Sequence, residues 1–295
     1  MKRSLLLFIY FIALSQLNIS AEDVDYKNMI QPGRWLKNIT VDTEFMGESS
    51  TANIQIYFPK DYVKGKRLRT IIALHQSDKS ERDWEFSRIE TYAERYNMVI
   101  VCPYMKRSVY ENSFYPETNY KWNPIPGGKF LGETLIKFLN SNFSLASKKE
   151  STGIVGVELG AHGAILTACY YPNRFKVAAG ISGFYDPTAM QRNRMIEAVY
   201  GSYKSFQERW DNDASPLKLA EKLKGVYVFL YHGLKNDVYQ PEQSRVMAIR
   251  IKQLQKKSSD YSVTYKENKS GSKGWGFWSS PLADIMSFMN DNLSE

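Results

Sequence analysis

The sequence predicts an α/β fold, a single domain built on a mostly parallel sheet with helices on both faces. Short apolar runs at 70–74 (TIIAL) and 98–101 (MVIV) are typical of strands that are buried on both sides. The segment between them, 82–96, has the periodicity of an amphipathic helix. Because successive parallel strands need a crossover connection, this alternation favours a parallel sheet covered by helices.

The remaining elements continue the alternation along the chain. Further strands are expected at 53–58, 152–157, 177–181, 225–231 and 261–266. Further helices are expected at 130–143, 161–171, 243–255 and 281–293. The long connection 104–126 is dense in aromatic residues, so it is expected either to be functional or to pack on itself.

The amino-acid composition excludes several classes of protein. Of 295 residues, 43% are hydrophobic and 24% are charged, which excludes a disordered chain. The two cysteines, Cys102 and Cys169, exclude a disulfide scaffold and lie in apolar contexts typical of buried free thiols. The net charge of +8 comes without a block of basic residues interleaved with aromatics, so no nucleic-acid partner is expected.

The N-terminus has the three parts of a secretory signal peptide. A basic start at Lys2 and Arg3 precedes an apolar run over 4–14, and Ala21 offers a small residue for cleavage. A retained anchor is the alternative, but the run is short for a bilayer span of about 20 residues. We therefore expect a signal peptide at 1–21, a secreted or periplasmic protein, and no stable membrane span after cleavage.

A sharp turn from a buried strand into a helix is predicted at 156–164 (GVELGAHGA). Its context is that of the nucleophile elbow G-x-S-x-G, in which the glycines let strand and helix approach closely. Gly156 and Gly160 occupy the glycine positions, and Glu158 stands where the motif has serine. The turn is therefore an elbow that lacks its hydroxyl nucleophile.

With this elbow the chain resembles the esterase D, feruloyl-esterase and mycolyltransferase group of the α/β-hydrolase fold. Four further motifs occur in that family's order: YPNRF at 171–175 with ISG at 181–183, SPLKLAEKL at 215–223, YHG at 231–233 and GSKGWGFW at 271–278. The resemblance implies one α/β-hydrolase domain over 22–295. It also implies a triad delivered in the chain order nucleophile, acid, histidine.

The resemblance assigns substituted residues to the triad positions. The acid position after Gly233 falls on Asn236, with Asp237 one residue late, and Lys273 stands at the histidine position. Acyl transfer through serine needs a hydroxyl, a base and an acid that orients the base. We therefore expect Glu158, Asn236, Asp237 and Lys273 to be vestigial positions without activity.

The histidines and the expected oxyanion loop also depart from the family's pattern. His75 ends a strand, His162 lies in the helix after the elbow, and His232 precedes the acid position, so none is in sequence position to act as base. Gln76 stands where the family has glycine in its oxyanion loop. The backbone N–H groups at Gln76 and Leu159 are the expected oxyanion positions.

Glu158 and Lys273 carry opposite charges at positions that meet in an active hydrolase. An ion pair within about 4 Å is therefore expected, with Asn236 or Asp237 orienting the lysine. The start of the following helix also favours an anion at Glu158. The alternative is two unrelated surface charges.

The leading hypothesis is an esterase-like protein that has lost hydrolase activity and acts as a binding or structural protein. Its expected partner is an unknown protein or a small-molecule or glycan ligand. The candidate cleft-lining residues are Tyr120, Trp122, Trp275 and Trp278, with core packing as the alternative for the last two.

The rival hypothesis is an active carboxylic-ester hydrolase with non-standard catalytic residues. Glu158 would attack the substrate itself, or an unrelated serine would do so. Lys273 cannot activate water unless burial strongly lowers its pKa. The sequence contains no HExxH, EF-hand or Walker-type motif, so no metal or cofactor is expected.

Overall fold

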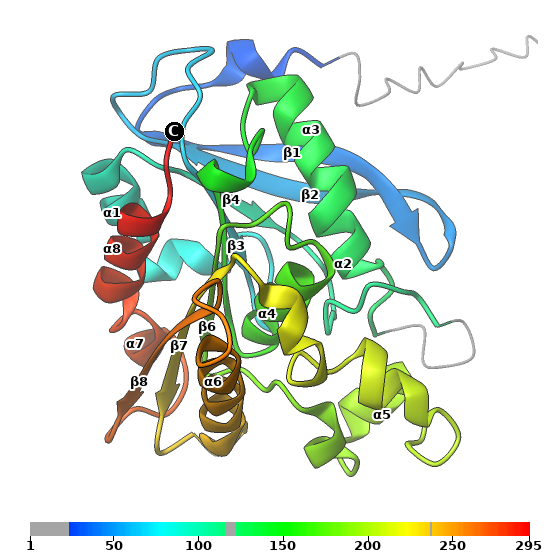
Figure 1. The fold of residues 1–295 in the computed structure, drawn as a ribbon. Helices are drawn as coiled ribbons and strands as arrows, with labels where there is room; N and C mark the ends of the chain where they lie inside the picture. Colours follow the sequence, from blue (N-terminus) through cyan, green and yellow to red (C-terminus); the bar gives the residue numbers. More distant parts are fainter. Residues whose placement is uncertain (1–23, 116–121, 237) are drawn as a thin grey trace, which may run out of the picture.

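The structure, a computed structural model, describes residues 24–115, 122–236 and 238–295. In this part of the chain eight strands form one sheet, in the order β1-β2-β4-β3-β5-β6-β7-β8 (Figure 1). The β1–β2 and β2–β4 contacts are antiparallel and the other five are parallel, which confirms the predicted mostly parallel sheet. The strands are β1 (Arg34–Phe45), β2 (Glu48–Phe58), β3 (Thr70–Leu74), β4 (Val99–Pro103), β5 (Thr152–Val157), β6 (Val177–Ile181), β7 (Tyr227–Gly233) and β8 (Ser262–Asn268).

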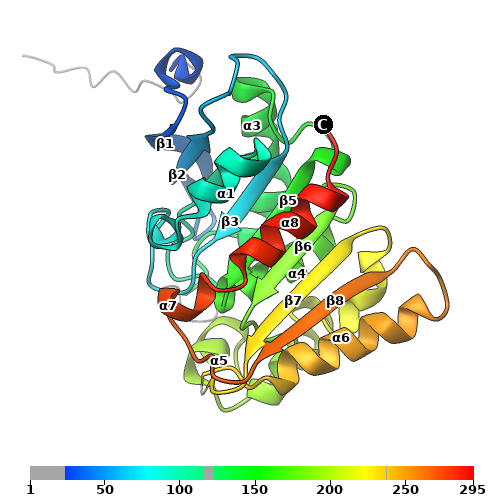
Figure 2. The ribbon, with the colours of Figure 1, turned by 90° about the vertical axis from the view of Figure 1, so that its left-hand side faces the viewer.

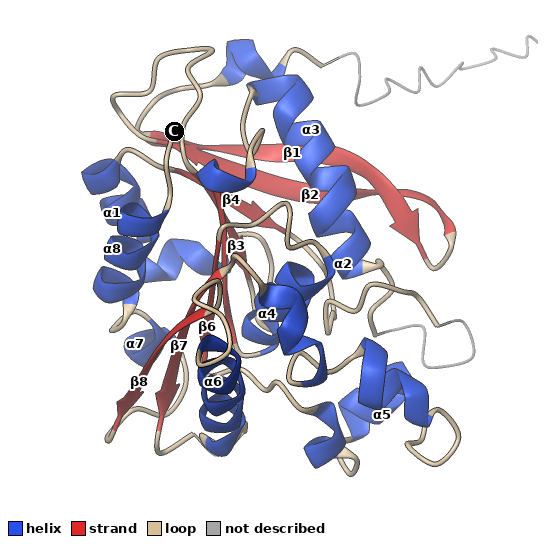
Figure 3. Cartoon of the chain, in the orientation of Figure 1, coloured by secondary structure: helices blue, strands red, loops and turns tan. Residues whose placement is uncertain are grey.

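Helices cover both faces of the sheet, as predicted (Figures 2 and 3). One face carries α1 (Ile89–Tyr96), α7 (Trp275–Trp278) and α8 (Leu282–Asn292). The other carries α3 (Leu135–Phe143), α4 (Leu159–Tyr170) and α6 (Glu242–Gln255). Two shorter helices, α2 (Gly127–Lys129) and α5 (Arg194–Tyr200), lie in the connections.

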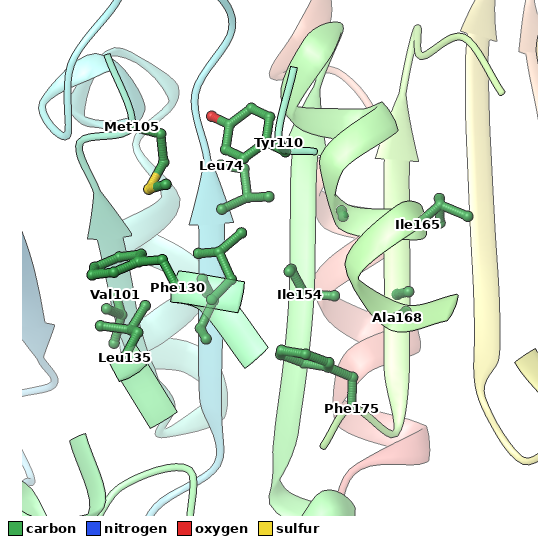
Figure 4. Packing of buried hydrophobic residues seen from close by; sticks show 14 of the residues in the cluster. Leu74, Val101, Met105, Tyr110, Phe130, Leu135, Ile154, Ile165, Ala168 and Phe175 are labelled. Carbon is green, nitrogen blue, oxygen red and sulfur yellow. The ribbon is translucent and has the colours of Figure 1, made fainter. Parts of the chain in front are cut away.

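The core is divided by the sheet into two layers. Along β3, Ile72 and Leu74 belong to the layer under α3 and α4, while Ile71 and Ala73 belong to the layer under α1 and α8. This alternation follows from the two-residue period of a strand. Figure 4 shows the first layer, with Leu74 and other strand side chains facing residues such as Phe130. A strand that is buried on both faces therefore has apolar residues at successive positions in its sequence.

Short helices such as α5 and α7 were not predicted, and three longer elements also differ from the prediction. The helix expected at 82–96 is a 3-10 turn, η3 (Asp83–Ser87), followed by α1, because Arg88 has φ 56° and interrupts the helix. The helix expected at 130–143 begins with a π turn over Phe130–Thr134. Strand β1 was not predicted, because it is an edge strand whose polar residues hide its alternation.

Two further expectations concern the cysteines and the membrane. Cys102 and Cys169 are both buried and unpaired, as predicted. Over the described ranges, no helix combines the length and apolar character that a membrane crossing requires. The predicted signal peptide at 1–21 lies outside the described residues.

Strand β5 and helix α4 approach so closely that two positions exclude any side chain. A Cβ atom on Gly156 would lie 2.0 Å from the carbonyl oxygen of Gly160. A Cβ atom on Gly160 would lie 2.4 Å from the carbonyl oxygen of Leu74, in β3. Both clashes are with backbone, which cannot rotate away. The two glycines are therefore required where the chain turns from β5 into α4.

We expect Gly156→Ala to lower the free energy of unfolding by about 3 kcal/mol, at the upper end of overpacking costs, because the methyl group would push α4 away from β5. Urea unfolding followed by circular dichroism measures the change. The matched control is Gly276→Ala in α7, where an added Cβ meets nothing within 4 Å. Equal unfolding midpoints for the two variants would contradict this account.

Candidate functional site

Glu158 lies at the turn between β5 and α4, at the predicted elbow. Its backbone has φ 52° and ψ −111°, a conformation that costs a non-glycine residue on the order of 1–3 kcal/mol. The turn is held by the Glu158 N–H, which donates to Ile181 O at 2.9 Å, and by the Glu158 carbonyl, which accepts from the His162 N–H at 3.1 Å. The side chain is only 7% exposed. The elbow thus presents a carboxyl group on a strained turn.

The two expected oxyanion positions lie on elements that touch. Leu159 is the first residue of α4, where the backbone N–H groups have no intrahelical acceptor. Gln76 follows His75 at the end of β3, and a Cβ atom on Gly160 would lie 2.7 Å from His75 O. The Gln76 carbonyl accepts a hydrogen bond from His75 Nδ1 at 2.5 Å. The imidazole therefore fixes the conformation of this loop.

All three histidines are buried and hydrogen-bonded. Burial lowers the pKa of His75 to about 4 and that of His162 to about 3, and it also lowers the pKa of His232. His162 Nε2 has no hydrogen-bond partner among the described residues, but this side chain is fully buried against the Phe184 ring. The ring nitrogens of His75 contact Gln76 O and the Met105 N–H. His162 Nδ1 contacts Phe184 O. The ring nitrogens of His232 contact the Ser244 hydroxyl and Tyr239 O. Each histidine thus has a structural role.

The loops that carry the acid and base positions lie side by side. The Lys235 N–H donates to Gly271 O at 2.9 Å, and a Cβ atom on Gly233 would lie 2.3 Å from the same oxygen. Lys273 follows in the loop between β8 and α7, and its side chain is exposed. The parallel topology therefore brings the triad positions to one edge of the sheet, at the carboxyl ends of β5, β7 and β8.

Asn236 organises the turn that follows β7. The side chain is 3% exposed, and its Oδ1 accepts from the backbone N–H groups of Val238 at 2.9 Å and Tyr239 at 3.1 Å. Its Nδ2 has no hydrogen-bond partner among the described residues. Asp237 lies outside them. The amide oxygen of Asn236 therefore already accepts two backbone hydrogen bonds.

The Glu158–Lys273 ion pair stays a prediction. The exposure of Lys273 changes its expected strength, because water screens a pair with one exposed partner. The cost of about 3–5 kcal/mol that applies to breaking a fully buried pair is therefore too high for this site.

The expected cleft tryptophans take part in packing, the alternative given for two of them. Trp278, the last residue of α7, is 3% exposed and belongs to the core layer under α1 and α8. The Trp275 indole N–H donates to Asp83 Oδ1 at 3.0 Å, and its ring packs edge-on against Trp84 at 5.0 Å. These contacts dock α7 on η3. Trp122 is partly buried under the Arg107 guanidinium, and Tyr120 lies outside the described residues.

A cavity of about 780 Å³ lies between residues 188–193 and 238–243. Tyr239 forms part of its wall and stacks on Phe184 at 5.3 Å. Burial, and then the nearby Glu158 carboxyl, raise the pKa of Tyr239. In the described part of the chain, no group of three or more His, Cys, Asp or Glu side chains is placed to hold a metal ion.

Comparison with known families agrees with this geometry. The family model described as "Putative esterase" matches residues 47–289. The chain belongs to this esterase family. The resemblance inferred from the motifs is therefore confirmed.

Individual relatives of this esterase-family chain are distant. An acetyl esterase of Caldicellulosiruptor saccharolyticus is 26% identical over 249 residues, which cover 79% of this chain and 87% of that protein. A diacylglycerol acyltransferase/mycolyltransferase, Ag85A of Mycobacterium gordonae, is 20% identical over 290 residues, covering 89% and 82%. The solved structure of the Staphylococcus aureus fluorophosphonate-binding serine hydrolase FphF matches with a TM-score of 0.68 at 18% identity, covering 88% and 99%. This last match shows a shared fold.

Sequence reasoning missed a buried acid, Glu111, in the aromatic connection. The side chain is fully buried, and burial raises its pKa to about 8. One carboxyl oxygen accepts from the Asn112 N–H at 2.7 Å, and the other has no hydrogen-bond partner among the described residues. The carboxyl group faces the tyrosines Tyr115, Tyr170 and Tyr200, which come from three different segments. The only feature of the sequence that could have indicated this buried acid is a glutamate placed among aromatic residues.

A double-mutant cycle on Glu158→Gln and Lys273→Met tests the ion pair. We expect a coupling free energy of about 0.5–1 kcal/mol in low salt, which falls in high salt because one partner is exposed. Urea unfolding of the four proteins measures it. The reference cycle is the Glu44–Lys129 pair, at 3.0 Å with both side chains about half exposed. A coupling of zero at both salt concentrations would show that the two charges are unrelated.

Glu111→Gln is expected to make stability less dependent on pH. The folded state holds the Glu111 proton up to about pH 8, whereas the unfolded chain releases it near pH 4.5. The wild-type protein therefore loses stability as pH rises through this window, by about 5 kcal/mol, and the variant does not. Unfolding free energies at several pH values test this, with the exposed Glu208→Gln as control. Parallel pH profiles for wild type and Glu111→Gln would refute it.

Proposed function

We propose that this esterase-family chain has lost ester hydrolysis and acts as a secreted or periplasmic binding protein. The observation that carries the proposal is the residue at the elbow, a carboxyl group in the strained position where the family's chemistry needs a hydroxyl. Localisation outside the cytoplasm rests on the predicted signal peptide at 1–21.

The histidines support the same proposal. Serine-type acyl transfer needs an imidazole that takes a proton from the nucleophile and returns it to the leaving group. The three imidazoles of this chain are buried, and their lowered pKa values make them weak proton acceptors. At the base position, where the family has histidine, stands Lys273, an exposed residue without an imidazole.

A binding role needs a surface that admits a ligand. The cavity at 188–193 and 238–243 is of a size that accommodates small molecules, and it shares Tyr239 with the surroundings of the elbow. We propose that a small-molecule, glycan or protein ligand is bound there.

The second candidate function is ester hydrolysis through non-standard residues. Membership of the esterase family and the similarity to an acetyl esterase favour it. The Glu158 carboxylate would then attack the acyl carbon, the ester C–O bond would break, and the alcohol would leave with a proton from solvent. Water, activated without a histidine, would cleave the resulting anhydride into the free acid and the Glu158 carboxylate. The other route is attack by an unrelated serine. Ser182, which follows β6, is fully buried and is therefore not accessible to a substrate.

We expect the purified chain to hydrolyse p-nitrophenyl acetate and methyl ferulate no faster than Glu158→Ala does, because the elbow provides no hydroxyl. Initial rates, together with the intact mass after treatment with a fluorophosphonate, measure this. The matched comparison is the rebuilt variant Glu158→Ser with Lys273→His and Asn236→Asp, in which a gain of turnover would mark the ancestral site.

Three outcomes separate the candidates. Absence of turnover and of a mass adduct supports the binding protein. Turnover that Glu158→Ala abolishes establishes a hydrolase that uses the elbow carboxylate. Turnover that survives Glu158→Ala, with an adduct mapped to a serine, establishes the other route.

A further inference from the structure

A second cavity, of about 440 Å³, lies beside the loop that carries Gln76. Its walls come from the tip of the β1–β2 hairpin at 45–46, from Asp78 after β3, from the loop that follows β4, and from Pro124. These segments are far apart in the sequence but meet at one end of the molecule. Of the triad positions that the structure describes, Glu158, Asn236 and Lys273, none lines this cavity.

Backbone hydrogen bonds hold these segments together. The Met46 N–H donates to Pro124 O at 2.7 Å, and the Asn123 N–H donates to Arg107 O at 2.6 Å. Asn123 is itself buried, and its side-chain oxygen accepts from the Ser108 hydroxyl at 3.1 Å. The cavity is therefore formed by a connected scaffold.

The charges on its walls are unequal. The Lys106 ammonium lies 4.2 Å from the centroid of the Phe45 ring, and none of the ion pairs among the described residues involves it. The Arg107 guanidinium lies 5.1 Å from the Trp122 ring and is paired with Asp78. The single carboxylate of the wall is thus already neutralised, and one ammonium remains held over an aromatic face.

Three residues of the cavity wall have an unusual backbone conformation. Met46, Asp78 and Lys106 all have positive φ, at 54°, 60° and 55°. Non-glycine residues rarely adopt such values, and they persist where the surrounding structure enforces them. These backbone conformations set the course of the segments that carry Asp78 and Lys106.

We propose that this cavity binds a small organic anion whose charged group is carried on an apolar ring. The anionic group would pair with Lys106, and the ring would pack against Phe45, Tyr104 and Pro124. A cationic ligand would face a wall whose net charge is positive, and a neutral one would leave the ammonium unpaired. The proposal uses neither Glu158 nor Lys273, so it holds whether or not the elbow has lost hydrolysis.

Two matched fluorescent probes test this inference on the whole chain. The probe 1-anilinonaphthalene-8-sulfonate is an aromatic anion, and N-phenyl-1-naphthylamine has the same rings without the charge. We expect saturable binding of the anion that weakens with salt and that Lys106→Met weakens about tenfold, the usual value of one charge-assisted contact. The neutral probe should bind more weakly and respond to neither change.

The control variant is Lys129→Met, which removes a nearby lysine that is paired with Glu44 outside the cavity. It should leave binding of the anionic probe unchanged. Equal affinity of the anion for wild type and Lys106→Met would overturn the proposal. Equal losses in the two variants, or absence of saturable binding, would overturn it as well. Because no ester is hydrolysed in this experiment, its failure is distinct from failure of the proposed loss of hydrolysis.

Discussion

The contact between β5 and α4 is the constraint on which the rest of the site depends. Two glycines let the strand and the helix touch through their backbones, and the chain can then turn between them only through a strained residue. That residue is Glu158. The same contact brings the end of β3, with the loop at Gln76, against the start of α4. An elbow of this kind is a property of the backbone, so it persists when the side chain at its tip changes.

The reaction at an elbow depends on side chains and not on the backbone turn. A hydrolase of this fold needs a titratable imidazole near the elbow, and here each imidazole is enclosed in the core. Enclosure disfavours the protonated form, and hydrogen bonds fix the rings. His75 shows the consequence most clearly, because both of its nitrogens hold loop backbone. Different residues therefore specify the fold and the reaction, so a chain can keep the fold without the residues that the reaction needs.

Much of the fold could be predicted from local pattern. The buried strands β3 to β7 are visible as apolar runs because both of their faces are covered. Edge strand β1 was missed because its polar residues face solvent. The break at Arg88 was missed because nothing in the sequence requires that residue to adopt a positive φ. Long-range packing decided both cases.

The sequence by itself determined the family and the glycines of the elbow, and it predicts the substituted triad positions, because these depend on motifs and their spacing along the chain. Only the tertiary structure decided that Trp278 is a core residue, that Lys273 is exposed and that Glu111 is buried among tyrosines. Burial depends on which distant segments fold over a side chain. No local pattern carries that information.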